Sequence, residues 1–226
     1  LKRHINIAIN KEYIEIQKYA FRKYKIKTVE NKHTHLVPEE LEQLERLSLT
    51  GKHMKLQKSL DAFLFCCYAG MRYSDFTNLS KKNIVDINQE TWLIYKSVKT
   101  GTEVRLPLYL LFAGKGIVIL NKYRNNLEDF FRLRDNSNIN KDLIIIAKLA
   151  GLSKKISFHT ARHTNATLLI YNGVNITTVQ KLLGHKSVKT TQVYTNIMDM
   201  TIVHDLEKMK QAALGIKKKT DNSFNK

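Results

Sequence analysis

A histidine and an arginine with helical spacing lie in the segment Ser157-Phe158-His159-Thr160-Ala161-Arg162-His163-Thr164. On a helix, His159 and Arg162 are three positions apart, so both side chains project from one face near the start of the helix. The free amides of a helix N-terminus and an arginine can bind phosphate oxygens together. The segment therefore predicts a site for an anionic, phosphate-like group.

Two further residues could take part in the same chemistry. Leu183-Gly184-His185-Lys186 places a histidine after a glycine, and Tyr194 follows nine residues after His185. Each feature has a simpler explanation when it is taken alone. These explanations are a solvated His-x-x-Arg face, a helix C-cap followed by an exposed histidine, and a packing tyrosine. The hypothesis of a phosphate site therefore depends on the combination.

His159 and His163 also have the His-x-x-x-His spacing with which a helix presents two imidazoles to zinc. The metalloprotease pattern requires a glutamate directly after the first histidine, and Thr160 occupies that position. We therefore expect no zinc site. For His163 we expect a packing or hydrogen-bonding role behind the phosphate site.

The elements that must position these residues are predicted to be mostly helical. Only two prolines and nine glycines occur in 226 residues, which favours long helices with few turns. Apolar periodicity and capping residues predict helices over 4–24, from Val37-Pro38 to about 47, 55–69, 115–134, 138–150, 159–172, 176–183, a short one from 187, and 200–214.

Three short segments are rich in Ile, Val, Thr, Tyr and Trp and are separated by turn signals. They cover residues 83–87, 91–98 and 102–106, and they predict a three-stranded antiparallel sheet. The expected fold class is therefore mainly α with a small three-stranded antiparallel sheet, an α+β arrangement.

The composition points to a polyanionic partner. Thirty-eight Lys and Arg residues against 20 Asp and Glu give a formal charge of +18, and 43% hydrophobic residues exclude a disordered chain. Such a surplus fits nucleic acid or an acidic membrane face. No apolar run approaches the roughly 18 residues that a membrane span requires.

Cys66 and Cys67 are adjacent in an apolar run, so we expect two buried thiols in a reducing compartment rather than a disulfide scaffold.

The C-terminal third of the chain resembles the tyrosine recombinase (phage integrase) family. The matching residues are His159-x-x-Arg162, Leu182-Leu183-Gly184-His185 and Tyr194, in the family's order and spacing. The segment Tyr68-Ala69-Gly70-Met71-Arg72-Tyr73-Ser74-Asp75 is similar to the family's first-arginine box. Lys99 lies at the predicted hairpin turn where the family carries a lysine. The resemblance covers residues 34 to about 214.

The resemblance implies phosphoryl transfer at one DNA phosphate. Arg72 and Arg162 would clamp the scissile phosphate, and His185 would add a third donor to the same oxygens. Tyr194 would attack phosphorus and form a covalent phosphotyrosine at a DNA 3′ end.

The resemblance also assigns proton transfers. Lys99 would deliver a proton to the departing 5′ oxygen, and His159 would act as a base toward the tyrosine or hold the phosphate. Asp75 resembles the acidic residue that follows the family's first arginine and would support the site. Alternatives remain open: Lys99 as an ordinary turn lysine beside Lys96, and Asp75 as the partner of a surface cation. Guanidinium groups replace the usual metal cation, so we expect no metal and no cofactor.

By the same resemblance the chain has three parts. Residues 1–33 would be the end of an N-terminal core-binding (clamp) domain and a linker, 34–214 the catalytic domain, and 215–226 a basic, disordered tail. The chain starts without methionine and shows no signal peptide, so we expect a fragment whose natural N-terminus lies upstream.

The expected partner is double-stranded DNA, with most lysines at phosphates and no membrane involved. The helix over 200–214 has two interpretations: it packs on its own domain, or it docks on a neighbouring protomer and orders a homo-tetramer on DNA. The resemblance favours the second.

The leading function hypothesis is a site-specific recombinase or integrase of a bacterial or phage mobile element, acting in the cytoplasm on nucleoid DNA. One alternative is a non-catalytic DNA-binding module of the same fold, whose mark would be loss of Tyr194 or of an arginine. Another is a type IB topoisomerase, which relaxes DNA as a monomer. The Leu-Gly-His box and the docking helix favour the recombinase.

Overall fold

The structure is a computed structural model that describes residues 1–19, 21 and 34–197. The chain divides into two units, Leu1–Lys32 and His33–Lys226. The first contains helix α1 (Lys2–Asn10) and the 3-10 helix η1 (Ile16–Lys18). The helix expected over 4–24 is thus too long: α1 ends at Asn10, and Glu12 takes a left-handed φ of 59° that interrupts the helix.

The second unit is mainly helical and carries one small sheet, which confirms the predicted fold class. Helix α2 begins at Pro38 as expected, and the Val37 amide donates to Glu40 Oε2 at 2.9 Å. The helical elements are α2 (Pro38–Glu45), η2 (Gly51–Leu56), α3 (Gln57–Ala69), α4 (Tyr73–Phe76), η3 (Lys81–Asn83), η4 (Leu111–Gly114), α5 (Lys115–Lys122), α6 (Leu127–Phe131), α7 (Asn136–Leu149), α8 (Phe158–Tyr171), α9 (Ile176–Leu183), η5 (Val188–Thr190) and η6 (Gln192–Ile197).

The sheet consists of β1 (Ile84–Ile87), β2 (Glu90–Lys96) and β3 (Glu103–Pro107), in the order β1-β2-β3 with both pairs antiparallel. Leu93 pairs with Leu106, and Tyr95 with Val104; all four side chains are buried. These residues alternate with exposed ones because successive side chains of a strand point to opposite faces. The register therefore fixes which face of the β2–β3 hairpin meets the helices.

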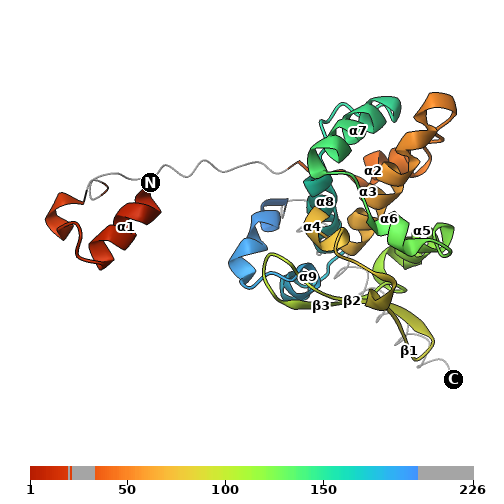
Figure 1. Cartoon of the computed structure of the whole chain (residues 1–226). Helices are drawn as coiled ribbons and strands as arrows, with labels where there is room; N and C mark the ends of the chain where they lie inside the picture. The colour runs from red at the N-terminus through yellow and green to blue at the C-terminus, as the bar shows by residue number, and fades with distance from the viewer. Residues whose placement is uncertain (20, 22–33, 198–226) are drawn as a thin grey trace, which may run out of the picture. The chain divides into compact units, whose positions relative to one another are not determined.

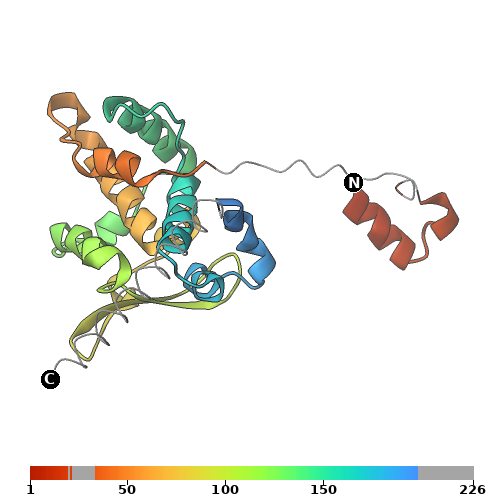
Figure 2. The ribbon, with the colours of Figure 1, turned by 180° about the vertical axis from the view of Figure 1, so that it is seen from behind.

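Helix α3 forms the centre of the core. All residues from Ser59 to Ala69 are buried, including the free cysteines Cys66 and Cys67, as expected. Five phenylalanines from four helices pack around it in mostly edge-to-face contacts with ring centroids 5.3–6.3 Å apart. They are Phe65, Phe76, Phe130, Phe131 and Phe158. In Figures 1 and 2 the sheet lies at one end of the second unit and helices α2 and α7 toward the other.

The prediction of one helix over 115–134 is wrong. The segment forms two helices, because α5 ends at Lys122 and α6 begins after Asn126. Asn126 caps α6 by accepting from the Asp129 amide at 3.3 Å, and this local bond competes with a continuous helix. The helix expected over 200–214 and the tail over 215–226 lie outside the described residues.

Gly70 ends α3 in a left-handed conformation with φ of 66°. A Cβ at this position would lie 2.6 Å from Asn165 Oδ1 and 2.8 Å from Leu183 Cδ2. Asn165 in turn donates from Nδ2 to the Cys67 and Tyr68 carbonyls at 2.9 and 3.0 Å. The end of α3 is therefore fitted closely against both α8 and α9, which only glycine permits.

Gly70→Ala should accordingly lower the free energy of unfolding by about 2–4 kcal/mol, since the left-handed backbone and the two close contacts are both penalised. Gly151→Ala is the matched control: its φ is 77°, but no atom lies within 4 Å of the added Cβ. This control should cost about 1 kcal/mol. Urea unfolding of both variants checks the difference, and equal losses would contradict the close fit.

Candidate active site

Helix α8 carries the central residue of the candidate site. The Ser157 amide donates to Thr160 Oγ1 at 3.0 Å, and the Phe158 amide donates to Asn140 Oδ1 at 2.8 Å. These bonds satisfy free amides of the first turn and attach it to α7. Residues from Thr160 to Leu169 are then buried, polar ones included. The simpler interpretation, a solvated His-x-x-Arg face, is therefore wrong for Arg162, of which 1% is exposed.

The Arg162 guanidinium is held by two backbone carbonyls. Nη1 donates to the Gly70 oxygen at 2.8 Å, and Nη2 donates to the Leu183 oxygen at 2.6 Å. Both carbonyls lie at C-terminal ends of helices, where the helix dipole is negative and carbonyls lack partners within the helix. Burial, and next the charge of Arg72, lower the pKa of Arg162 to about 10, so it stays protonated at neutral pH.

Arg72 stands at the start of α4 and is connected to the sheet through Asp75. Its Nη1 lies 3.5 Å from Asp75 Oδ2 and 3.3 Å from Ser97 Oγ. The carboxylate of Asp75 is buried, accepts from the Val98 amide at 2.8 Å and lies 3.3 Å from Ser97 Oγ. Among the described residues Asp75 therefore pairs with Arg72 rather than with a surface cation, and it joins Arg72 to the β2–β3 turn.

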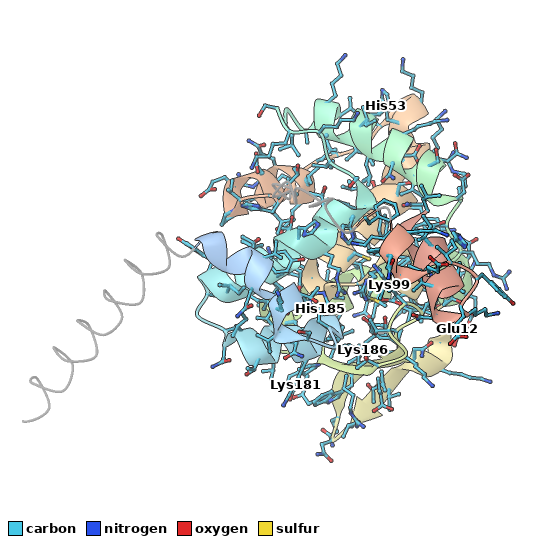
Figure 3. The ribbon with its side chains drawn as sticks, turned by 90° about the vertical axis from the view of Figure 1, so that its left-hand side faces the viewer. Glu12, His53, Lys99, Lys181, His185 and Lys186 are labelled. Atoms are coloured by element: carbon cyan, nitrogen blue, oxygen red, sulfur yellow. The ribbon has the colours of Figure 1, made fainter. Side chains whose placement is uncertain are left out.

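That turn carries Lys99, whose side chain is exposed. The turn is closed by the Ser97 amide, which donates to the Thr102 oxygen, and by the Gly101 amide, which donates to the Ser97 oxygen, both at 2.8 Å. Thr100 Oγ1 donates to the Gly184 oxygen at 3.2 Å. The turn is thus attached to the end of α9, directly before His185, and Figure 3 shows Lys99 and His185 on the same face.

His185 is 8% exposed, so the simpler interpretation as an exposed histidine is wrong. Its Nδ1 lies 2.9 Å from Oγ1 of the buried Thr191. Burial lowers the pKa of His185 to about 3, with further contributions from Arg162, Arg72, Lys99 and His159, in that order. Each of these four cationic or potentially cationic groups disfavours a charge on the imidazole. His185 is therefore neutral near pH 7 in the free chain.

Tyr194 completes the cluster from η6. Its ring centroid lies 5.5 Å from that of His163, which in turn lies 4.4 Å from that of the exposed His159. Burial raises the pKa of the Tyr194 hydroxyl, and Arg162 and Arg72 act in the opposite direction. His163 is 7% exposed and packs between the other two rings. The six predicted residues and Asp75 therefore lie in one region.

Sequence reasoning missed three residues that position this region: Ser97, Thr100 and Thr191. In the sequence, only their positions could have indicated a role: Ser97 and Thr100 lie within two residues of Lys99, and Thr191 lies six residues after His185. Tyr95 was missed as well. It is 5% exposed, and its hydroxyl has no hydrogen-bond partner within the described part of the chain. Burial raises the pKa of Tyr95 and keeps the phenol neutral.

The described ranges contain no group of three or more His, Cys, Asp and Glu side chains that is placed to bind a metal ion. None of the helices described is long and apolar enough to cross a membrane. What the site offers is a concentration of positive charge from guanidinium and ammonium groups beside a buried tyrosine. Such an arrangement suits an anionic group whose charge increases during a reaction.

Comparison with known proteins identifies the class. The sequence profile of the Phage integrase family matches residues 34–200, and the chain belongs to this family. A tyrosine recombinase of Pseudothermotoga lettingae is 30% identical over 181 residues, covering 78% of this chain and 60% of the relative. Tyrosine recombinase XerC of Rickettsia prowazekii is 29% identical over 185 residues, covering 77% and 58%. The chain thus spans about three fifths of the length of these relatives.

Solved structures share the fold. A lambda integrase tetramer bound to a Holliday junction has a TM-score of 0.66 at 19% identity, with 85% of this chain and 56% of that chain covered. The XerH recombinase in a post-cleavage complex with its difH substrate has a TM-score of 0.58 at 22% identity, with 80% and 52% covered. Both confirm the mainly helical fold with the small antiparallel sheet.

The depressed pKa of His185 predicts a dependence of stability on pH. Below about pH 6.5 the unfolded chain takes up a proton on this imidazole, whereas the folded chain does so only near pH 3. The stability that the neutral His185 contributes above pH 6.5 is therefore lost as the pH falls toward 3. Between pH 7 and 5 the loss should be about 2 kcal/mol greater than in His185→Gln.

Urea unfolding at a series of pH values measures this difference. His4→Gln, at an exposed histidine of the first unit, is the control and should follow the unsubstituted chain. Parallel curves for the chain and His185→Gln would contradict the assigned pKa.

Proposed function

We propose that this chain is the catalytic part of a site-specific DNA recombinase that cleaves and rejoins strands through a covalent 3′-phosphotyrosine. The observation that carries the proposal is the packing of Tyr194 against His163, the residue after Arg162, in a region where Arg162 is buried on backbone carbonyls and Arg72 is held by Asp75. The tyrosine supplies a nucleophile, and the arginines supply charge for the phosphate that it attacks.

Arg72 and Arg162 bind the non-bridging oxygens of the scissile phosphate in this proposal. Arg162 uses two of its five donors on backbone carbonyls, and the other three, which bind no other described residue, serve the phosphate oxygens. Its buried guanidinium cannot turn without losing those bonds, so it is oriented before the DNA arrives. Pre-oriented donors stabilise developing charge without reorganisation during the reaction.

His185 acts as a neutral hydrogen-bond donor. When Thr191 Oγ1 donates to Nδ1, the neutral imidazole carries its proton on Nε2, which can donate to a phosphate oxygen. A bound phosphate adds negative charge next to the imidazole and favours its protonated form. Burial and the surrounding cations therefore oppose protonation of His185 until the phosphate is present.

The proton transfers involve Tyr194 and Lys99. The tyrosine oxygen attacks phosphorus and its proton is released toward His159, the exposed base candidate of α8; the His163 ring packs against both side chains. The bond from phosphorus to the 5′ oxygen breaks, and Lys99 donates a proton to that oxygen. The reverse sequence rejoins the strand. The raised pKa of the Tyr194 hydroxyl is consistent with a need for such a base.

The partner is double-stranded DNA, and the surplus of +18 supports binding to its phosphates. Solved structures of this fold that hold DNA, including a lambda integrase tetramer on a Holliday junction, support a homo-tetramer on DNA. In this proposal residues 200–214 dock on a neighbouring protomer, and a clamp domain ends near residue 33. The biological role is the integration or excision of a bacterial mobile element. The Leu-Gly-His box favours a recombinase over a type IB topoisomerase, and the presence of Tyr194 and both arginines favours an enzyme over a binding module.

The covalent intermediate can be tested with nicked suicide duplexes whose central sequence is randomised. Cleavage next to the nick releases a short 5′-hydroxyl fragment, so the 3′-phosphotyrosine is trapped. We expect an adduct that is visible on a denaturing gel, forms in EDTA and disappears in Tyr194→Phe. Tyr171→Phe, on the same domain, is the matched control and should form the adduct. An adduct that persists in Tyr194→Phe, or one that requires Mg²⁺, would overturn the mechanism.

The proton donor can be tested with a duplex in which sulfur replaces the bridging 5′ oxygen at the cleavage point. A thiol of pKa about 8.5 leaves without protonation, whereas an alkoxide does not. Lys99→Ala should slow cleavage of the oxygen duplex by about 10²–10⁴-fold and restore near-normal rates on the sulfur duplex. Lys96→Ala, at the exposed end of β2, should leave both rates unchanged. An equal loss on both duplexes would exclude Lys99 as the acid.

A further inference from the structure

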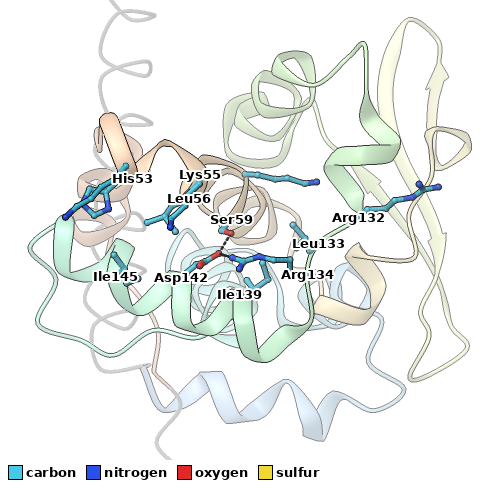
Figure 4. Close-up of a pocket in the computed structure, with 12 residues that line it drawn as sticks. His53, Lys55, Leu56, Ser59, Arg132, Leu133, Arg134, Ile139, Asp142 and Ile145 are labelled. Atoms are coloured by element: carbon cyan, nitrogen blue, oxygen red, sulfur yellow. Dashed lines mark hydrogen bonds and ion pairs between the residues drawn. The ribbon is translucent and has the colours of Figure 1, made fainter.

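A second cationic region lies away from Tyr194, in a cleft between η2–α3 and the α6–α7 segment. The cavity measures about 470 Å³. Figure 4 shows Ser59, Asp142 and Arg134 meeting within it, with His53 toward one end and Arg132 toward the other. Its basic lining residues are Lys52, His53, Lys55, Lys58, Arg132 and Arg134.

The charges of this cleft are largely uncompensated. Asp142 is the one acidic residue among the described residues that line the cavity, and Ser59 Oγ at 2.6 Å and Arg134 already bind it. Lys58 pairs with Asp129 at 2.9 Å. Lys52, Lys55 and Arg132 form no ion pair with any other described residue. Like charges held close together repel one another, and a bound anion relieves that repulsion.

The cleft is connected to the candidate active site. Tyr73, the residue after Arg72, donates from its hydroxyl to the Arg134 carbonyl at 2.5 Å. The Tyr73 ring also packs edge-to-face on Phe158, with centroids 5.4 Å apart, and Phe158 directly precedes His159. Arg134 is therefore one residue and one hydrogen bond away from an arginine of the proposed phosphate clamp. The cleft and the clamp are thus linked through Tyr73.

We propose that this cleft binds the sugar–phosphate backbone of duplex DNA beside the cleavage point. The inference rests on the proposed function for its choice of partner. Lysines and arginines around a concave surface fit a ridge of phosphates. The hydrogen bond from Tyr73 to Arg134 links the cleft to the residue after Arg72, which favours the DNA already engaged by the clamp. The half-buried Leu133 and the exposed Ile145 offer apolar contact to deoxyribose.

The test compares two double variants with the same change of charge. Lys52→Glu/Lys55→Glu alters the cleft, and Lys141→Glu/Lys148→Glu alters exposed positions of α7 that do not line it. Both are made in a Tyr194→Phe background, so cleavage does not enter and failure of the adduct experiment does not affect the result. Thermal melting checks that both variants fold.

Fluorescence anisotropy then measures the affinity for duplexes lengthened one base pair at a time, at several salt concentrations. We expect the cleft variant to bind long duplexes at least tenfold more weakly than the control. The slope of log affinity against log salt should fall by about 2, because two lysines no longer neutralise phosphates. The loss of affinity should appear only above a certain duplex length, at which the DNA becomes long enough to reach the cleft.

Two outcomes would overturn the proposal. Equal losses in both double variants at every duplex length would show that only the overall charge matters. Unchanged DNA affinity of the cleft variant, together with loss of binding to polyglutamate, would assign the cleft to an acidic protein instead.

Discussion

The site depends on one buried guanidinium. Moving a charged group out of water costs several kcal/mol unless hydrogen bonds replace the lost hydration. Arg162 meets that requirement with carbonyls from the ends of α3 and α9, two helices far apart in the sequence. Both helices end in a left-handed glycine, Gly70 or Gly184, where a Cβ would meet a neighbouring side chain at 2.6 Å. Gly70 is therefore needed because the end of α3 must approach α8 and α9 closely enough for both helix ends to share one arginine, and Gly184 is needed because the end of α9 packs directly on Val104 of β3.

The second requirement is electrostatic. Arg72, Lys99, Arg162 and His159 all act on His185, and the buried Asp75 is the acidic side chain that contacts Arg72. A group of cations with so little compensation is stable only because the core around α3 and α8 is extensive. The cluster therefore carries an excess of positive charge that a bound phosphate would neutralise. Because of its burial and of this excess, the imidazole of His185 stays neutral.

The sequence predicted a large part of this structure. Gly70 and Gly184 ended helices as expected, and the alternation of apolar residues located the three strands to within about two residues. The order of His159, Arg162, His185 and Tyr194 identified the region of the site. Other features could not be predicted, because they depend on contacts between distant segments. The burial of His185 needs Thr191 and the β2–β3 hairpin, and Asn126 interrupted a helix through a local bond that apolar periodicity does not reveal.

The hydrogen bonds around the site form a closed ring. From Arg162 one route passes through Gly70, Arg72 and Asp75 to the Lys99 turn, and the other passes through Leu183 and Gly184 to Thr100 on that same turn. In a ring, any two members stay connected by one route when the other is broken. Losing one link should therefore loosen the geometry, whereas losing one link from each route should separate the Lys99 turn from Arg162. The damage from two such changes would exceed the sum of the single ones.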